Sequence, residues 1–232
     1  KSMGQTACAI TDHGVMYGAI DFYRACKAEG IKPIIGCEVY VAPRTRFDKQ
    51  HEFDNEARHL VLLCENEEGY RNLSYLVSMA HVEGFYIKPR IDMDLLREHC
   101  GGLIACSACL AGELPRLLLA GEYDQAKAVA LEMQSLFGPD GYYLELQDHG
   151  IPSQKQVNAG LRRIHEETGL PLVCTNDAHY LTKADAYAHD VLLCIQTGKT
   201  VDDENRMRYE PQNFYLRSTE EMETLFAQYP GA

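Results

Sequence analysis

Two short stretches of this sequence end in an acid and a histidine, residue types that bind metals and move protons. They are Thr11-Asp12-His13 in CAITDHGVMYG and Asn176-Asp177-Ala178-His179 in LVCTNDAHYL. In both, an apolar run stops abruptly at the polar group. An Asp-x-His pair lets one short loop supply two metal ligands, or one ligand and the partner that orients it. Either pair alone is more often a helix cap beside a polar histidine, but two at equivalent strand ends favour a functional site.

Further residues of the same types border the other apolar runs: Glu38, His59, Cys109, Glu145 and His149. Carboxylates, imidazoles and a thiol together are a donor set typical of Zn²⁺ or Mn²⁺ sites. Such a site lowers the pKa of a bound water and holds phosphoryl oxygens. Cys106-x-x-Cys109 has no second C-x-x-C, so a zinc-ribbon or redox interpretation is weakly supported.

These side chains can meet only if their strands end at one edge of the fold. Short runs rich in Val, Ile, Leu and Tyr alternate with helix-like segments, which predicts parallel strands joined by crossover helices. Ligands of such folds bind at the carboxyl ends of the strands. The predicted strands are 6–11, 33–42, 59–64, 102–107, 142–147 and 170–175, and the predicted helices are 17–29, 67–81, 123–137, 153–168, 183–196 and one that begins at Ser218. Residues 43–57 and 199–212 read as polar, irregular stretches.

The composition sets limits on the class of protein. A chain of 232 residues suits one large α/β domain or two small ones, and no apolar run is long enough to cross a membrane. A net charge of −12 disfavours nucleic-acid binding by the chain alone. Bound divalent cations can reverse the sign of a carboxylate-rich pocket, and a larger parent protein can supply basic surface.

The cysteines and the amino terminus indicate the compartment. Nine cysteines, several inside apolar runs, are an odd number and are expected to be reduced thiols. The start KSMGQTACAI lacks an initiator Met and the features of a signal peptide. We therefore expect a cytoplasmic protein and a chain that is a piece of a longer one.

Long strings of the sequence are similar to one known family. AITDHGVMYGAIDFYRACKAEGIKPIIGCEVYVAPR, HLVLLCENEEGYRNL, GLIACSACLAGELPR, TNDAHYL and AHDVLLCIQTGKTVDDENRMRYE closely resemble the polymerase-and-histidinol-phosphatase (PHP) domain of bacterial DNA polymerase III alpha subunits. The resemblance covers nearly the whole chain. It implies that residues 1–232 form a PHP domain with a distorted (β/α)₇ barrel and up to three metal ions at the strand ends.

The resemblance also assigns roles to residues. Matched by motif, the metal ligands are expected to be His13, Glu38, His59, Cys109, Asp177 and His179. His13, Asp177 and His179 are expected to be catalytic. The family's first motif, a His-x-His on an amino-terminal strand, has no counterpart here. We therefore expect a domain that lacks its first strand and that also stops before its usual end.

The function implied by the resemblance is a metal-dependent phosphoesterase or 3′–5′ exonuclease within a replicative DNA polymerase. Zn²⁺ or Mn²⁺ is the expected metal, with Mg²⁺ serving the polymerase chemistry that lies in other domains. Lys88 and Arg90 of IKPR could contact substrate phosphate, or could be ordinary surface charges. The expected partners are DNA and other polymerase III holoenzyme subunits, including a proofreading exonuclease subunit, and no membrane. The alternatives are an inactive docking platform for that proofreading subunit and a stand-alone histidinol-phosphatase-like phosphoesterase.

Overall fold

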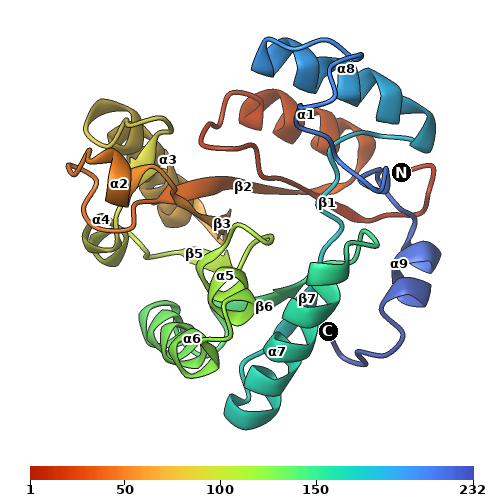
Figure 1. Ribbon diagram of the computed structural model, residues 1–232. Coiled ribbons are helices and arrows are strands. Elements are labelled where there is room, and N and C mark those ends of the chain that lie inside the picture. The colour runs from red at the N-terminus through yellow and green to blue at the C-terminus, as the bar shows by residue number, and fades with distance from the viewer.

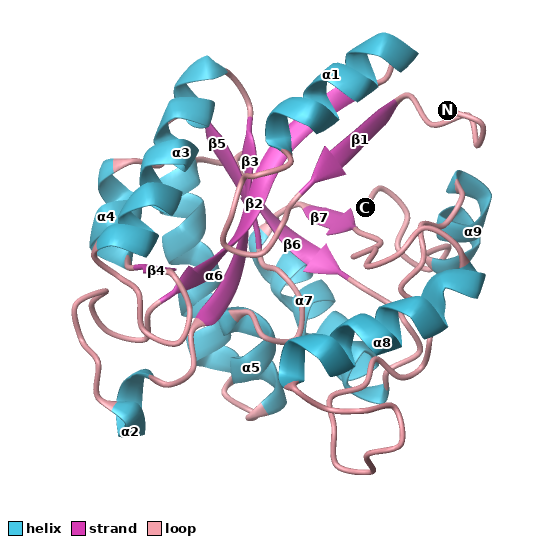
Figure 2. Ribbon diagram, turned by 90° about the horizontal axis from the view of Figure 1, so that it is seen from above, coloured by secondary structure: helices cyan, strands magenta, loops and turns pink.

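A curled sheet occupies the middle of the molecule, and helices cover its outside (Figures 1 and 2). The computed structural model describes residues 1–232. The strands are β1 (Ala7–Ile10), β2 (Lys32–Val41), β3 (Arg58–Cys64), β4 (Arg90–Ile91), β5 (Leu103–Cys106), β6 (Tyr142–Leu146) and β7 (Leu172–Cys174). The helices are α1 (Ala19–Glu29), α2 (His51–Asp54), α3 (Glu67–Val82), α4 (Met93–Glu98), α5 (Glu113–Leu119), α6 (Tyr123–Phe137), α7 (Pro152–Thr168), the 3₁₀ turn η1 (Lys183–Asp185), α8 (Ala186–Thr197) and α9 (Thr219–Leu225).

The helix ends follow local sequence signals. Gly30, Gly169 and Gly198 adopt the left-handed conformation just beyond α1, α7 and α8, where a residue with a Cβ would be strained. Ser218 and Glu221 form a capping box at the start of α9. Every helix and strand expected from the sequence is present, whereas the short elements β4, α2, α4 and α5 were not predicted.

The sheet corrects one prediction, because it is not wholly parallel. Its order is β1-β2-β3-β5-β6-β7, with β4 pairing to β2. β3 runs antiparallel to both β2 and β5, whereas β1–β2, β5–β6 and β6–β7 are parallel. A parallel return needs a crossover of a dozen or more residues, usually a packed helix, whereas an antiparallel return does not. Residues 42–57, between β2 and β3, contain only the four-residue helix α2, so the chain returns antiparallel.

The two faces of the sheet differ in chemistry. On β2 and β3 the outward side chains Cys37, Val39, Leu60 and Leu62 are buried against the helices in a continuous hydrophobic core. Alternate residues of the same strands face inward, because side chains of a strand alternate between its faces. Glu38 and Val61 are paired on that inner face and line a cleft. The curl of the sheet thus keeps apolar packing outside and gathers polar groups inside.

No helix in the structure combines the length and apolar character that crossing a membrane requires.

Candidate metal centre

His13 is fixed beside Glu38 by an extension of the β1–β2 pairing. Beyond Ile10 the ladder continues, with the Glu38 N–H donating to Asp12 O (3.1 Å) and the Gly14 N–H to Glu38 O (3.0 Å). His13 and Glu38 therefore form a parallel bridge, and His13 Nδ1 lies 3.8 Å from Glu38 Oε1. The chain turns at Gly14, whose left-handed φ of 66° and close approach to Pro89 leave no room for a Cβ.

His59 reaches the same carboxylate from the opposite strand direction. Its Nδ1 is in hydrogen-bonding contact with Glu38 Oε1. His59 stands near the start of β3, and because β3 is antiparallel, this start lies at the edge where β1 and β2 present His13 and Glu38. A histidine at the beginning of a strand thus joins a site otherwise built at strand ends.

Cys109 completes this side of the site. Its loop follows β5 and is held to β3 by the His59 N–H, which donates to Ala111 O (3.1 Å). Cys109 Sγ lies 3.5 Å from His59 Nδ1 and 3.8 Å from Glu38 Oε1. The residue before it, Ala108, has a left-handed φ of 63°, an uncommon conformation for a residue with a Cβ.

Asp177 and His179 face this group from the loop after β7. Asp177 Oδ1 lies 3.4 Å from His179 Nε2, and the His179 ring centroid is 6.1 Å from that of His13. The loop is pinned by its backbone, because the His179 N–H donates to Phe214 O (2.8 Å). Asp177 has a φ of 43°, a conformation that Asp tolerates better than most residues. Asp177 does not cap the following helix, since Thr182 and Asp185 form that capping box.

Burial and neighbouring charge set the protonation states of these groups. Burial, together with nearby His59 and His179, lowers the pKa of His13 and favours the neutral imidazole that binds metals. Burial pushes the pKa of Asp177 upward, but the hydrogen bond from His179 and the nearby histidines outweigh it, so the pKa is lowered. Burial and the carboxylate of Glu38 raise the pKa of Cys109 strongly, which keeps the thiol protonated.

Glu145 and His149, also noted as ligand types, have other contacts. The Glu145 carboxylate accepts hydrogen bonds from Thr175, Gln147 and the Ala108 N–H. Burial raises the pKa of Glu145 to about 7, although the hydrogen bonds from Thr175 and Gln147 act to lower it. His149 Nε2 donates to Asn176 O (2.9 Å), while its Nδ1 accepts from Gln154 (2.9 Å). Both of its ring nitrogens are therefore engaged outside the candidate centre.

Lys88 and Arg90 have different environments in the structure. The Lys88 side chain is exposed, with its Nζ 5.5 Å from the centroid of the Tyr40 ring, which itself lies 5.1 Å from the His59 ring. Arg90 is fully buried, and its guanidinium donates to four backbone carbonyls. Of the two, only Lys88 is exposed, so the expected phosphate contact of Arg90 is corrected to a role in holding the 46–54 loop.

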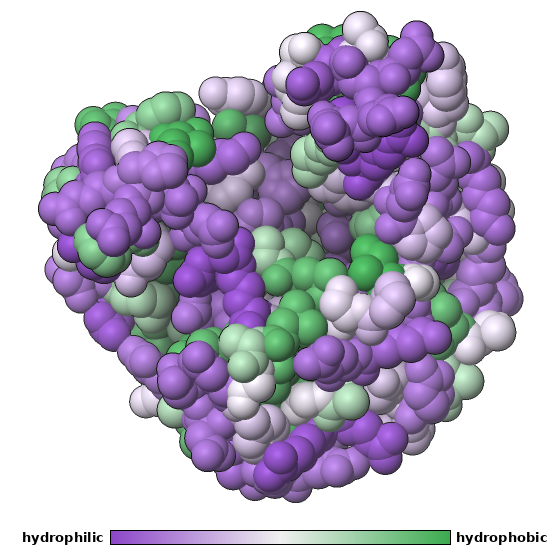
Figure 3. Space-filling view, in the orientation of Figure 1, coloured by the Kyte–Doolittle hydropathy of each residue, from purple (hydrophilic) through white to green (hydrophobic).

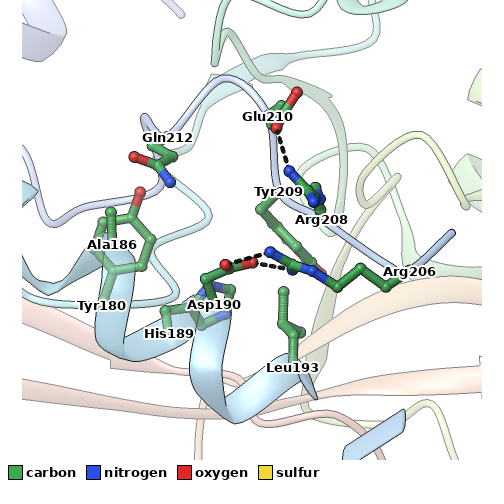
Figure 4. Close-up of a pocket in the computed structure, with 10 residues that line it drawn as sticks. All are labelled: Tyr180, Ala186, His189, Asp190, Leu193, Arg206, Arg208, Tyr209, Glu210 and Gln212. Carbon is green, nitrogen blue, oxygen red and sulfur yellow. Dashed lines mark hydrogen bonds and ion pairs between the residues drawn. The ribbon is translucent and has the colours of Figure 1, made fainter. Parts of the chain in front are cut away.

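Sequence reasoning missed Tyr209, which lies in the polar stretch 199–212. Its ring centroid is 4.7 Å from that of His179 and 5.1 Å from that of His189. Figure 4 shows how the stretch is held: Arg206 pairs with Asp190 of α8, with Tyr209 beside them. The only sequence signal was a polar, charged stretch, which did not indicate that a tyrosine would pack against a ligand candidate.

Four of the six candidate ligands line a cleft of about 680 Å³ on the inner face of the sheet. They are His13, Glu38, Asp177 and His179, and residues of β1, β3, β5, β6 and β7 are among those that line the remainder. Figure 3 shows the face seen in Figure 1 hollowed near its centre.

Comparison with known proteins identifies the family. The family model described as "PHP domain" matches residues 1–149, which is more than half of the chain. This chain belongs to the PHP-domain family. The expectation drawn from the motif strings is thereby confirmed.

The PHP domain is similar to DNA polymerase III alpha subunits of several bacteria. It is 50% identical over 231 residues to that of Treponema pallidum, covering 99% of this chain and 20% of the relative. It is 47% identical over 224 residues to that of Thermus aquaticus, covering 96% of this chain and 18% of the relative. The chain thus spans about a fifth of the length of these relatives. A solved structure of a presumed metal-dependent phosphoesterase from Bifidobacterium adolescentis aligns with a TM-score of 0.44 and 13% identity, covering 76% of this chain and 78% of that one.

The residues of the PHP domain fit a divalent transition metal. Ligand atoms of His13, Glu38 and His59 all lie within 4.8 Å of one another. Cys109 adds a sulfur donor to this set, and Asp177 with His179 offers a second oxygen and nitrogen pair across the cleft. Mixed nitrogen, oxygen and sulfur donors suit Zn²⁺ or Mn²⁺ better than Ca²⁺ or Mg²⁺, which prefer oxygen alone.

Proposed function

We propose that this PHP domain is a metal-dependent phosphoesterase of the 3′–5′ exonuclease type. The observation that carries the proposal is the convergence of His13, Glu38 and His59, whose ligand atoms lie within 4.8 Å of one another. Three such donors, from β2, β3 and the segment after β1, beside a large cleft, match a metal centre better than a structural polar cluster.

Each residue has a distinct task in this proposal. His13, Glu38, His59 and Cys109 hold one metal position, and Asp177 and His179 contribute to a second across the cleft. Bound Zn²⁺ or Mn²⁺ supplies activation of a water and neutralisation of phosphoryl charge. Asp177 orients the His179 imidazole through their 3.4 Å contact. His13 stays neutral because burial disfavours its charged form, and this leaves the lone pair of one ring nitrogen free to bind the metal.

The substrate is proposed to be the end of a DNA strand. The high identity to DNA polymerase III alpha subunits supports a role in DNA replication. Lys88 is the exposed cation next to the site, and it is placed to meet a substrate phosphate. The Tyr209 ring beside His179 offers a flat surface on which a base can stack.

The protein is proposed to act with partners of a replicative polymerase. DNA, the other holoenzyme subunits and a proofreading exonuclease subunit are the expected ones, and Mg²⁺ is expected to serve the polymerase reaction of a full-length alpha subunit. The net charge of −12 fits a domain that depends on bound cations and on neighbouring basic surface to hold DNA.

Metal analysis combined with a nuclease assay tests the proposal. The purified protein, dialysed against buffer with trace Zn²⁺ or Mn²⁺, is expected to retain metal by elemental analysis. It is then expected to shorten a 3′-terminal single-stranded oligonucleotide from its 3′ end. A protein that retains no metal and cuts no strand would contradict the proposal and favour a docking role.

A further inference from the structure

A buried carboxylate outside the ligand set connects the two halves of the metal centre. Glu145 is only 5% exposed and lies on the inner face of β6. Its Oε2 accepts from the Ala108 N–H (3.0 Å), directly before Cys109. Its Oε1 accepts from the Thr175 hydroxyl, two residues before Asp177. One side chain therefore touches both of the loops that carry the remaining ligands.

The backbone of Glu145 strengthens the same link. Its N–H donates to the Ser107 hydroxyl (2.8 Å), so the end of β5 is tied to β6 by side chain and main chain together. Gln147 donates to Glu145 Oε1 at 3.0 Å. Three protein groups donate to its two oxygens, so most of the acceptor capacity of the carboxylate is used within the protein.

The loops that Glu145 joins both contain strained backbone. Ala108 has a φ of 63° and Asp177 a φ of 43°, in the left-handed region that a residue with a Cβ rarely adopts. Such conformations persist where surrounding contacts over-determine them. The hydrogen bonds of Glu145 to Ala108 and Thr175 are contacts of this kind.

From these contacts we infer that Glu145 is a positioning residue, which fixes the Cys109 thiol and the Asp177–His179 pair relative to one another across the cleft. This inference rests on the proposed metal-dependent function. Removing the carboxylate leaves every ligand in the chain but frees the two loops to move apart. The thiol is the more sensitive of the two, because Ala108, its direct neighbour, loses a buried hydrogen bond.

The matched substitutions are Glu145→Gln, Thr175→Val and Thr175→Ser. Glu145→Gln keeps the size but presents an amide where an acceptor is needed. Thr175→Val removes the hydroxyl at nearly constant volume, and Thr175→Ser retains it. Glu122→Gln, on an exposed residue, is the control.

The measurement is Co²⁺ binding to the purified protein, followed by the thiolate-to-Co²⁺ charge-transfer band in the near ultraviolet. Glu145→Gln and Thr175→Val are expected to weaken Co²⁺ binding about tenfold and to diminish or shift this band. Thr175→Ser and Glu122→Gln are expected to match the unsubstituted protein. The band reports the placement of the thiol, which a general loss of packing elsewhere does not alter.

Three results would overturn the inference. Unchanged affinity and an unchanged band in Glu145→Gln and Thr175→Val would leave Glu145 as a satisfied core residue, while the proposed function stands. If Glu145→Gln fails to fold, the Thr175→Val and Thr175→Ser pair decides, and equal spectra from these two contradict the inference. An unsubstituted protein that takes up no Co²⁺ overturns the proposed function and this inference with it.

Discussion

Glu38 and His59 lie side by side although they are not partners in the β2–β3 register. Glu38 pairs with Val61, and His59 pairs with Tyr40. The contact between Glu38 Oε1 and His59 Nδ1 is therefore a diagonal one, across neighbouring positions of the same face. Since His13 Nδ1 lies 3.8 Å from the same oxygen, one carboxylate is shared by two imidazoles.

Replacing this carboxylate should remove the metal but not the fold. Glu38→Gln is expected to reduce Zn²⁺ affinity by at least about 100-fold, because the oxygen between the two imidazoles loses its charge. Elemental analysis and competition with a chelating dye measure the loss. Glu65→Gln, on an exposed residue, is the control and should bind Zn²⁺ normally. Equal affinity of the two variants would exclude Glu38 from the metal centre.

Asp177→Asn and His179→Ala should each lower the rate of 3′-end hydrolysis by at least about 100-fold. Asn also tolerates the φ of 43° found at Asp177, so the backbone should be retained. Neither residue caps a helix, and we therefore expect thermal midpoints close to that of the unsubstituted protein. His51→Ala and Asp21→Asn, both on exposed residues, are the matched controls. Unchanged hydrolysis rates with lowered thermal midpoints would mean that the TNDAH loop has a structural role only.

Metal binding should strengthen with rising pH because Cys109 must lose its proton. Burial and Glu38 raise the pKa of this thiol, so it remains protonated in the metal-free protein at neutral and mildly alkaline pH. A bound metal requires the thiolate, and its binding therefore releases about one proton. Between about pH 7 and pH 9 the affinity is expected to rise about tenfold per pH unit.

Cys109→Ser isolates this effect, since a serine hydroxyl does not ionise in this range. The variant should show a nearly flat pH dependence of Co²⁺ affinity, whereas Cys100→Ser should keep the slope. Calorimetry in buffers of different ionisation enthalpy counts the released protons directly. The same slope in Cys109→Ser would mean that the thiol is not a ligand.

The residue types and spacing of the site could be predicted, but its geometry depended on topology. His59 opens its strand, and in the parallel sheet that the sequence predicts it would lie at the edge opposite the other strand ends. Only the antiparallel direction of β3, set by the connection between β2 and β3, brings it to Glu38. Local sequence patterns predict that a strand exists, and they do not fix its direction.

Contacts between residues far apart in the chain could not be predicted from the sequence either. Arg90 lies in a charged motif that favoured an exposed phosphate contact, yet β4 is two residues long and buries it completely. Tyr209 packs on His179 from a segment with no periodicity. In both cases the contact partners are distant in the chain, and no local pattern encodes them.

Glu145 should make the stability of the metal-free protein depend on pH. Its pKa in the folded state is raised from 4.5 to about 7 by burial, so the folded protein binds this proton more tightly than the unfolded chain. The contribution of Glu145 to stability is therefore fully present at acid pH and is lost as the pH rises to about 7. The loss amounts to about 3 kcal/mol, at about 1.4 kcal/mol for a tenfold change in proton affinity.

The Glu145→Gln variant has no carboxyl group to titrate at this position. Comparing its stability with that of the unsubstituted protein therefore isolates the contribution of Glu145. The free energy of unfolding of the variant minus that of the unsubstituted protein should increase by about 3 kcal/mol between about pH 4.5 and pH 8. Urea titrations with a chelator present measure both proteins over this range. Histidine titration affects both proteins alike and cancels in the difference. A difference that is constant with pH would show that folding does not raise the pKa of Glu145.

Lys88 and Arg90 should respond to substitution in opposite ways. Lys88→Ala removes an exposed cation beside the site and is expected to raise KM for the oligonucleotide several-fold, with kcat and stability nearly unchanged. Arg90→Ala leaves four buried carbonyls without their donor, and the free energy of unfolding should fall by about 3 kcal/mol or more. Steady-state kinetics and urea unfolding of the two variants make the comparison. Loss of stability in Lys88→Ala, or unchanged stability in Arg90→Ala, would contradict the division of roles between these two residues.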